Sequence, residues 1–109
     1  MHMVKPDLRR QQRVLVPTGH TMRIHGNGGS PQFEGTVTVI GLGGMFIRTK
    51  KTQPPGTVLK LTLDDAVATF ESECTVRHVT DNGMGVEITK ISHQDEQRLR
   101  FLLIRLKGA

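Results

Sequence analysis

A chain of 109 residues, 36% of them hydrophobic, provides for one domain with a small core and not for two. Fifteen Lys and Arg against ten Asp and Glu give a net charge of +5, which favours an anionic partner. The single cysteine excludes an internal disulfide and a multi-cysteine metal site, and the absence of Trp and Tyr removes most stacking platforms for single-stranded bases.

The first thirteen residues are predicted to form a basic arm. Residues 1–3, Met-His-Met, are typical of a cloning remnant ahead of a natural start. The arm then carries Arg9, Arg10 and Arg13, whose planar guanidinium groups match phosphate oxygens and the O6/N7 edge of guanine. We therefore regard it as a candidate anion-binding element, with a solvated tail as the alternative.

From Val14 onward, short apolar stretches separated by turn residues predict an antiparallel all-β domain over residues 14–109. In 58–63 the leucines at 59, 61 and 63 alternate with the other residues, which predicts a strand with one buried face. In 67–79, Phe70, Cys74 and Val76 share one face, which predicts a second strand of the same kind. The expected strands are one or two within 14–25, then 36–40, 45–49, 58–63, 67–79 and 84–88, with glycine-rich turns at 26–31 and 41–44 and a hairpin turn at 81–83.

The hydrophobic period then changes to that of a helix at about residues 92–107. Ser92 is a suitable N-cap, and leucines follow at i, i+3, i+4 and i+7 from Leu99. About six strands and one amphipathic helix predict a small barrel or sandwich covered by that helix.

The candidate catalytic residues do not form a pattern. The histidines at 20, 25, 78 and 93 fall in different expected elements, and neither an HExxH nor a CxxC motif occurs. Cys74 is in phase with core residues, which favours a small buried side chain over a nucleophile. We expect no enzyme, no metal site and no cofactor. Without a secretory signal, or a run near the roughly 18 apolar residues of a membrane span, we expect a cytoplasmic protein with no membrane insertion.

The glycine-rich turn at 41–44 is the second candidate binding element. Gly41, Gly43 and Gly44 leave backbone N–H groups free of side-chain obstruction, so the turn can face a ligand. The alternative is a tight turn with a bulge.

These motifs, in this order, resemble the PilZ domain, a bacterial receptor module for cyclic di-GMP. Arg9 and Arg13 match the family's first motif, Arg-x-x-x-Arg. The resemblance covers nearly the whole chain and implies a six-stranded antiparallel Greek-key barrel with a C-terminal helix. It also implies that cyclic di-GMP is held by Arg9, Arg10, Arg13, Gly41, Gly43 and Gly44. The resemblance continues through Pro54-Pro55-Gly56-Thr57, Cys74-Thr75-Val76-Arg77 and Gly83-Met84-Gly85-Val86.

The family's second motif, Asp or Asn followed by Ser and Gly, is degenerate in this chain. Val39 and Gly41 occupy its polar positions, and only Gly44 is kept. Each missing polar interaction costs on the order of 1–3 kcal/mol, and 1.4 kcal/mol is about tenfold in affinity, so binding is expected to be weak. Arg48, Arg77 and the loop at 28–30 are candidates to compensate.

Three hypotheses follow. The first is a cyclic di-GMP receptor that acts as an adaptor on a partner protein. The second is a degenerate PilZ module for protein interaction, of the kind that serves motility and pilus systems, in which Val39 has joined the core. The third is a nucleic-acid-binding barrel, and we expect neither DNA nor RNA as a partner. Phe46 and Phe70 are in phase with strand cores and Phe101 lies on the helix, which leaves only Phe33 for stacking.

Overall fold

The computed structural model describes residues 13–17, 20–28, 31–66 and 68–108. These residues form seven strands and one helix, where about six strands and one helix were predicted. In chain order they are β1 (Val14–Leu15), β2 (Arg23–Gly26), β3 (Glu34–Ile40), β4 (Gly44–Arg48), β5 (Val58–Asp64), β6 (Thr69–Val79), β7 (Gly83–Lys90) and α1 (His93–Gly108).

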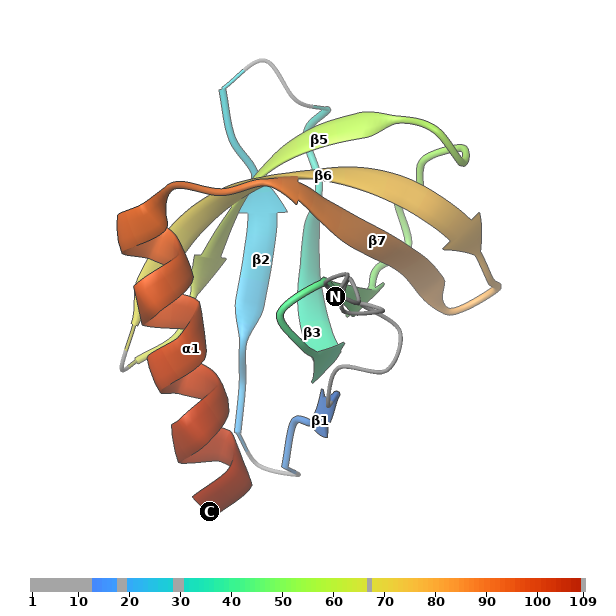
Figure 1. The fold of residues 1–109 in the computed structure, drawn as a ribbon. Helices are drawn as coiled ribbons and strands as arrows, with labels where there is room; N and C mark the ends of the chain where they lie inside the picture. The colour runs from blue at the N-terminus through green and yellow to red at the C-terminus, as the bar shows by residue number, and fades with distance from the viewer. Residues whose placement is uncertain (1–12, 18–19, 29–30, 67, 109) are drawn as a thin grey trace, which may run out of the picture.

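Six of the strands close into an antiparallel barrel, as predicted. The order around it is β3-β2-β5-β6-β7-β4, and a further pairing of β4 with β3 closes the ring. The additional strand is β1, which pairs with the end of β3 that β2 leaves free. Figure 1 shows the curved β5-β6-β7 ribbon over β2 and β3, with β1 below. The chain therefore closes its sheet edges by pairing.

A bulge in β3 decides which residues face the barrel interior. Val37 pairs with Ile47 and both are buried, but the register shifts before Val39, which pairs with Phe46. Phe46 lies between the buried Met45 and Ile47, so it points to the outer face, and Val39 shares that face. The expectation that Val39 joins the core is wrong, and so is the assignment of Phe46 to a core face.

The interior is filled by the alternating residues that the sequence indicated. Leu59, Leu61 and Leu63 of β5 are buried, as is Cys74 on β6. Phe33 is also buried, with 4% of its surface exposed, which corrects the prediction that it is free to stack on a base. Phe33, the stacking candidate of the nucleic-acid hypothesis, is therefore a core residue.

The helix α1 begins where the sequence predicted. The Ser92 hydroxyl accepts a hydrogen bond from the Asp95 N–H at 3.0 Å, which caps the first turn. Leu99, Leu102 and Leu106 are buried on its inner face, and α1 packs against β6 and β1. Within the described ranges, no helix has the length and apolar character needed to cross a membrane.

Gly44 allows β4 to approach β7 closely, because a Cβ at this position would contact the Val86 carbonyl oxygen. We predict that Gly44→Ala lowers the free energy of unfolding by about 2–3 kcal/mol, since neither backbone can withdraw without breaking the ladder. Urea unfolding followed by circular dichroism measures it. The comparison is Gly56→Ala, where φ is +93° but a Cβ meets nothing, for an expected loss of about 1 kcal/mol. Equal losses in the two variants would contradict the steric argument.

Candidate functional site

The pairing of β1 with β3 brings Arg13, the last residue of the predicted basic arm, to the glycine turn. Val14 pairs with Ile40 and Leu15 with Val39, so Arg13 lies at the register position next to Gly41. Arg13 is exposed. The two predicted binding elements, distant in sequence, therefore adjoin at one end of β3. Arg9 and Arg10 lie outside the described residues.

The glycine turn at 41–44 uses much of its own hydrogen-bonding capacity. The Gly41 N–H donates to the Gly44 carbonyl at 2.9 Å, and the Gly43 carbonyl accepts from the Ile88 N–H at 2.9 Å. The left-handed φ values among the described glycines occur at Gly28 and Gly56, so this turn does not depend on that conformation. The Gly41 N–H is committed to the turn, and the close approach of β7 explains why residue 44 is a glycine.

A row of four residues crosses the outer face of the barrel beside this turn. Val39 on β3 pairs with Phe46 on β4, Phe46 with Gly85 on β7, and Gly85 with His78 on β6. The Phe46 and His78 ring centroids are 6.3 Å apart with an interplanar angle of 30°. Gly85 makes room for this pair, because a Cβ there would contact the His78 imidazole. Together they form an apolar and aromatic surface that adjoins β1 through Val39.

Sequence reasoning missed Phe46 and His78 as site residues. The sequence pattern does not reveal the bulge in β3, which pairs the outward Val39 with Phe46. Without it, the sequence did not show that Phe46 lies on the outer face of β4. His78 was interpreted as a solvated or locally bonded imidazole. Gly85 could have indicated this surface from the sequence, because a glycine within a strand often marks a close approach by another group.

Arg77, Arg48 and the loop at 28–30, the candidates to compensate for the missing polar residues, lie in different parts of the barrel. Arg77 is ion-paired with Glu87, with 2.6 Å between its Nη2 and Oε1, and Glu87 is the register partner of Gly44. Arg48 lies two residues beyond Phe46 on the same face and is exposed. The loop at 28–30 joins β2 to the start of β3, at the end opposite the glycine turn, and only Gly28 of it is described.

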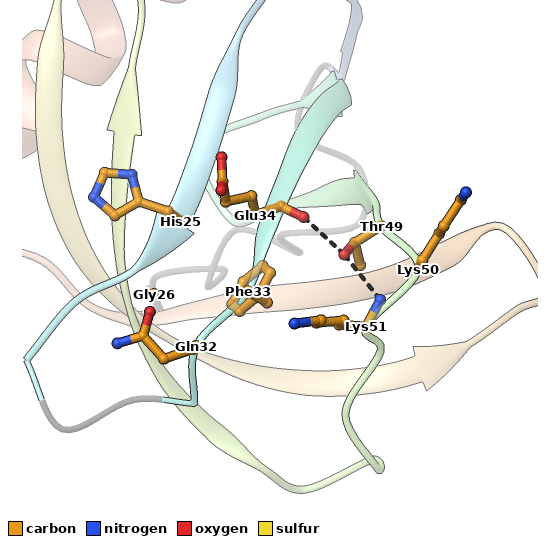
Figure 2. Close-up of a pocket in the computed structure, with 8 residues that line it drawn as sticks. All are labelled: His25, Gly26, Gln32, Phe33, Glu34, Thr49, Lys50 and Lys51. Atoms are coloured by element: carbon orange, nitrogen blue, oxygen red, sulfur yellow. Dashed lines mark hydrogen bonds between the residues drawn. The ribbon is translucent and has the colours of Figure 1, made fainter.

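A cavity of about 560 Å³ also lies away from the glycine turn, where β2, β3 and β4 meet at the other end of β3. Its rim is tied together by Thr49, whose hydroxyl donates to the Glu34 carbonyl at 2.8 Å and accepts from the Lys51 N–H at 3.1 Å. Figure 2 shows the Lys51 side chain extending toward Phe33, while Lys50 points away. Because none of the predicted ligand residues lines it, this cavity is separate from the predicted site.

Three further titratable residues, His20, Asp65 and Cys74, have structural surroundings that explain them. His20 Nε2 lies 2.6 Å from Oδ1 of the buried Asp65, which fastens the segment after β1 to the turn between β5 and β6. Across the described part of the chain, no three His, Cys, Asp or Glu side chains gather closely enough to hold a metal ion. Cys74 is buried in the core, and burial raises the pKa of its thiol to about 11.

Comparison with known proteins agrees with this architecture. A family model described as the PilZ domain matches residues 7–105. The fold is similar to the PilZ domain of YcgR from Escherichia coli, solved with c-di-GMP, with a TM-score of 0.74 and 12% identity over 94% of this chain and 93% of that one. It is also similar to MrkH, described as a c-di-GMP-dependent transcription regulatory factor, with a TM-score of 0.77 and 17% identity over 91% of this chain.

The chain spans about half of MrkH, 51% of its length. A third similar structure is an uncharacterised Legionella protein, with a TM-score of 0.62 and 19% identity over 89% of this chain and 95% of that one. No curated protein matches the chain. At these identities the solved structures establish the shared fold, and the family model establishes the relationship.

The buried thiol gives a prediction for stability at high pH. Burial raises the pKa of Cys74 from 9.0 to about 11, so between these values the unfolded state loses a proton that the folded state keeps. The contribution of Cys74 to stability is therefore full below pH 9 and falls as pH rises toward 11. We expect the unfolding free energy of the wild type to decrease more steeply than that of Cys74→Ala in urea titrations across this range. Parallel curves, or rapid alkylation of the folded protein at pH 8, would contradict this placement of the thiol.

Proposed function

Because the chain belongs to the PilZ domain family, a family of cyclic di-GMP receptors, we propose that it binds cyclic di-GMP weakly and acts as an adaptor on a partner protein. The observation that carries the proposal is the pairing of β1 with β3, which sets Arg13 beside the glycine turn. The solved PilZ domain of YcgR, similar in fold, holds c-di-GMP, and this likeness supports the same ligand here.

In this proposal the arginines supply the charge that the dianionic ligand requires. Arg13 stands on the exposed segment immediately before β1, and Arg9 and Arg10 precede it by a few residues. Guanidinium groups hold phosphate oxygens and the guanine O6/N7 edge with paired, charge-assisted hydrogen bonds. Binding orders the arm against the outer face of β3, and this change of surface is what a partner protein would detect.

The outer face offers a second kind of interaction. Phe46 and His78 present rings on the same surface as Val39, where the family's motif would present a polar side chain. Stacking of a base on an aromatic ring is worth about 1–3 kcal/mol, similar to one polar interaction of about 1–3 kcal/mol. The rings therefore compensate for one of the two polar side chains that are missing at Val39 and Gly41, which leaves the site weaker than a complete motif.

The second candidate function is a protein-interaction module of the same fold that does not bind cyclic di-GMP. Two observations favour it: Val39 presents an apolar side chain to the outer face, and the Gly41 N–H is committed within the turn. An apolar outer face beside a basic arm can serve a protein partner directly.

The first test is isothermal titration with cyclic di-GMP. We expect measurable heat with the wild type and at least tenfold weaker binding with Arg13→Ala, since a charge-assisted hydrogen bond of about 1.5–3 kcal/mol is removed. We also expect Val39→Asn to bind about tenfold more tightly, because an amide regains a hydrogen bond at this outward position.

The matched control for Val39→Asn is Val39→Ile, which keeps a β-branched apolar side chain and is expected to bind as the wild type does. Absence of heat with folded wild-type protein at high micromolar concentration would overturn the receptor proposal and favour the interaction module. A gain in both Val39 variants would show that the amide's hydrogen bond is not the cause.

A separate substitution tests the aromatic surface. We predict that His78→Ala weakens cyclic di-GMP binding about tenfold, because the ring pair beside Val39 loses one of its faces. His78 is exposed, so the fold should be unchanged by circular dichroism and thermal unfolding. Unchanged affinity would place the base elsewhere while leaving the role of Arg13 intact.

A further inference from the structure

The solvent face of α1 carries two large apolar side chains that the barrel does not cover. Phe101 is 52% exposed and Ile104 is 68% exposed, although four leucines of the same helix are buried against the core. Positions i and i+3 lie next to each other on a helix surface. The pair therefore forms one continuous apolar contact area, which we call the Phe101 face.

A recess adjoins this face. A hollow of about 420 Å³ lies between the first half of α1 and the connection from β5 to β6, and Phe101 forms part of its wall. The remaining lining is short or polar, and consists of Ala68, Thr69, Gln94, Gln97 and Arg98. An apolar side chain from a partner can enter here and contact the Phe101 ring while its backbone stays outside.

Positive charge predominates on α1 beyond its first turn, where Arg98 and Arg100 are ion-paired with Asp95 and Glu96 of that turn. Both acidic residues of α1, Asp95 and Glu96, lie in its first turn, and the rest of the helix contains Arg98, Arg100, Arg105 and Lys107 without an acid. The guanidinium carbon of Arg105 lies 5.8 Å from the centre of the Phe101 ring. The apolar pair is thus flanked by positive charge on its own helix.

The positive charge beside the Phe101 face indicates which kind of partner can bind there. A second copy of the chain would bring an equally basic half-helix to the face, and each copy carries a net charge of +5, so self-association is opposed. A segment with apolar anchors and carboxylates satisfies both features, with the anchors on Phe101 and Ile104 and a carboxylate on Arg105, which lies beside the Phe101 ring.

We propose that the Phe101 face is the docking surface for an acidic, apolar-anchored segment of a partner protein. The inference deepens the adaptor part of the proposed function and rests on it. The face is separate from the proposed ligand residues, because none of them lines the recess beside Phe101.

The test uses a synthetic helical peptide of about 16 residues with Leu on one face and Glu on the other, carrying one Trp. Because the chain has no Trp or Tyr, the peptide's fluorescence reports binding without interference. We expect saturable binding that weakens with added salt, and about tenfold weaker binding to Phe101→Ser and to Arg105→Gln. A peptide with Lys in place of Glu should not bind.

The matched control is Val58→Ser, which removes a side chain that is 54% exposed at the far end of the β5-β6 hairpin from the recess. It should bind the peptide as the wild type does. Equal binding of the Glu and Lys peptides, or unchanged binding to Phe101→Ser, overturns the proposal. So does a wild-type dimer in sedimentation that Phe101→Ser dissociates, since a second copy would then be the occupant.

Titration of the same variants with cyclic di-GMP separates the two proposals. Loss of peptide binding in Phe101→Ser with ligand binding retained supports a docking face distinct from the ligand site. Peptide binding by a wild type that gives no heat with cyclic di-GMP removes the receptor role and keeps the face.

Discussion

The arrangement of this molecule depends on the hydrogen bonding of β3, which has three strands as neighbours. β4 occupies one of its edges, while β2 and then β1 share the other. The Thr38 carbonyl, at the bulge, accepts from the Val16 N–H at 2.9 Å just beyond β1, and the Val37 N–H donates to the Met22 carbonyl at 2.9 Å. One strand thus closes the barrel, fixes the position of β1 and of Arg13 before it and, through its bulge, sets the orientation of the residues that follow.

The bulge has chemical consequences because side-chain direction alternates along a strand. An extra residue between Val37 and Val39 turns Val39 outward while Ile40 returns to the core. The apolar side chain of Val39 therefore belongs to the surface near Arg13 and not to the interior. An apolar residue on that surface, next to the Phe46 and His78 rings, exchanges directional recognition of guanine edges for contact that any flat apolar group can make.

Much of the fold follows from the sequence, because the residues concerned act locally. The alternating leucines at 59, 61 and 63 require a half-buried strand, and Ser92 before an i, i+3, i+4 stripe requires a helix start. Arg13 and the glycine turn were both identified as binding elements, but their adjacency depends on β1, which is too short for its pairing to be predicted from a pattern. Phe33 and Phe46 were misassigned for a related reason: the burial of Phe33 and the outward direction of the half-buried Phe46 depend on register, which non-local pairing sets.

β1 also connects the two surfaces for which binding is proposed. It has two residues, Leu15 is 75% exposed, and its neighbours are β3 on one side and α1 on the other. So short a strand has few backbone pairings to hold it, so external contacts can change its stability. A ligand shifts an equilibrium between two conformations only by its difference in affinity for them. A ligand that binds Arg13 in the proposed site therefore favours the conformation in which β1 is paired with β3 and in contact with α1. Coupling between the arm and the helix can therefore pass through two residues, without rearrangement of the barrel.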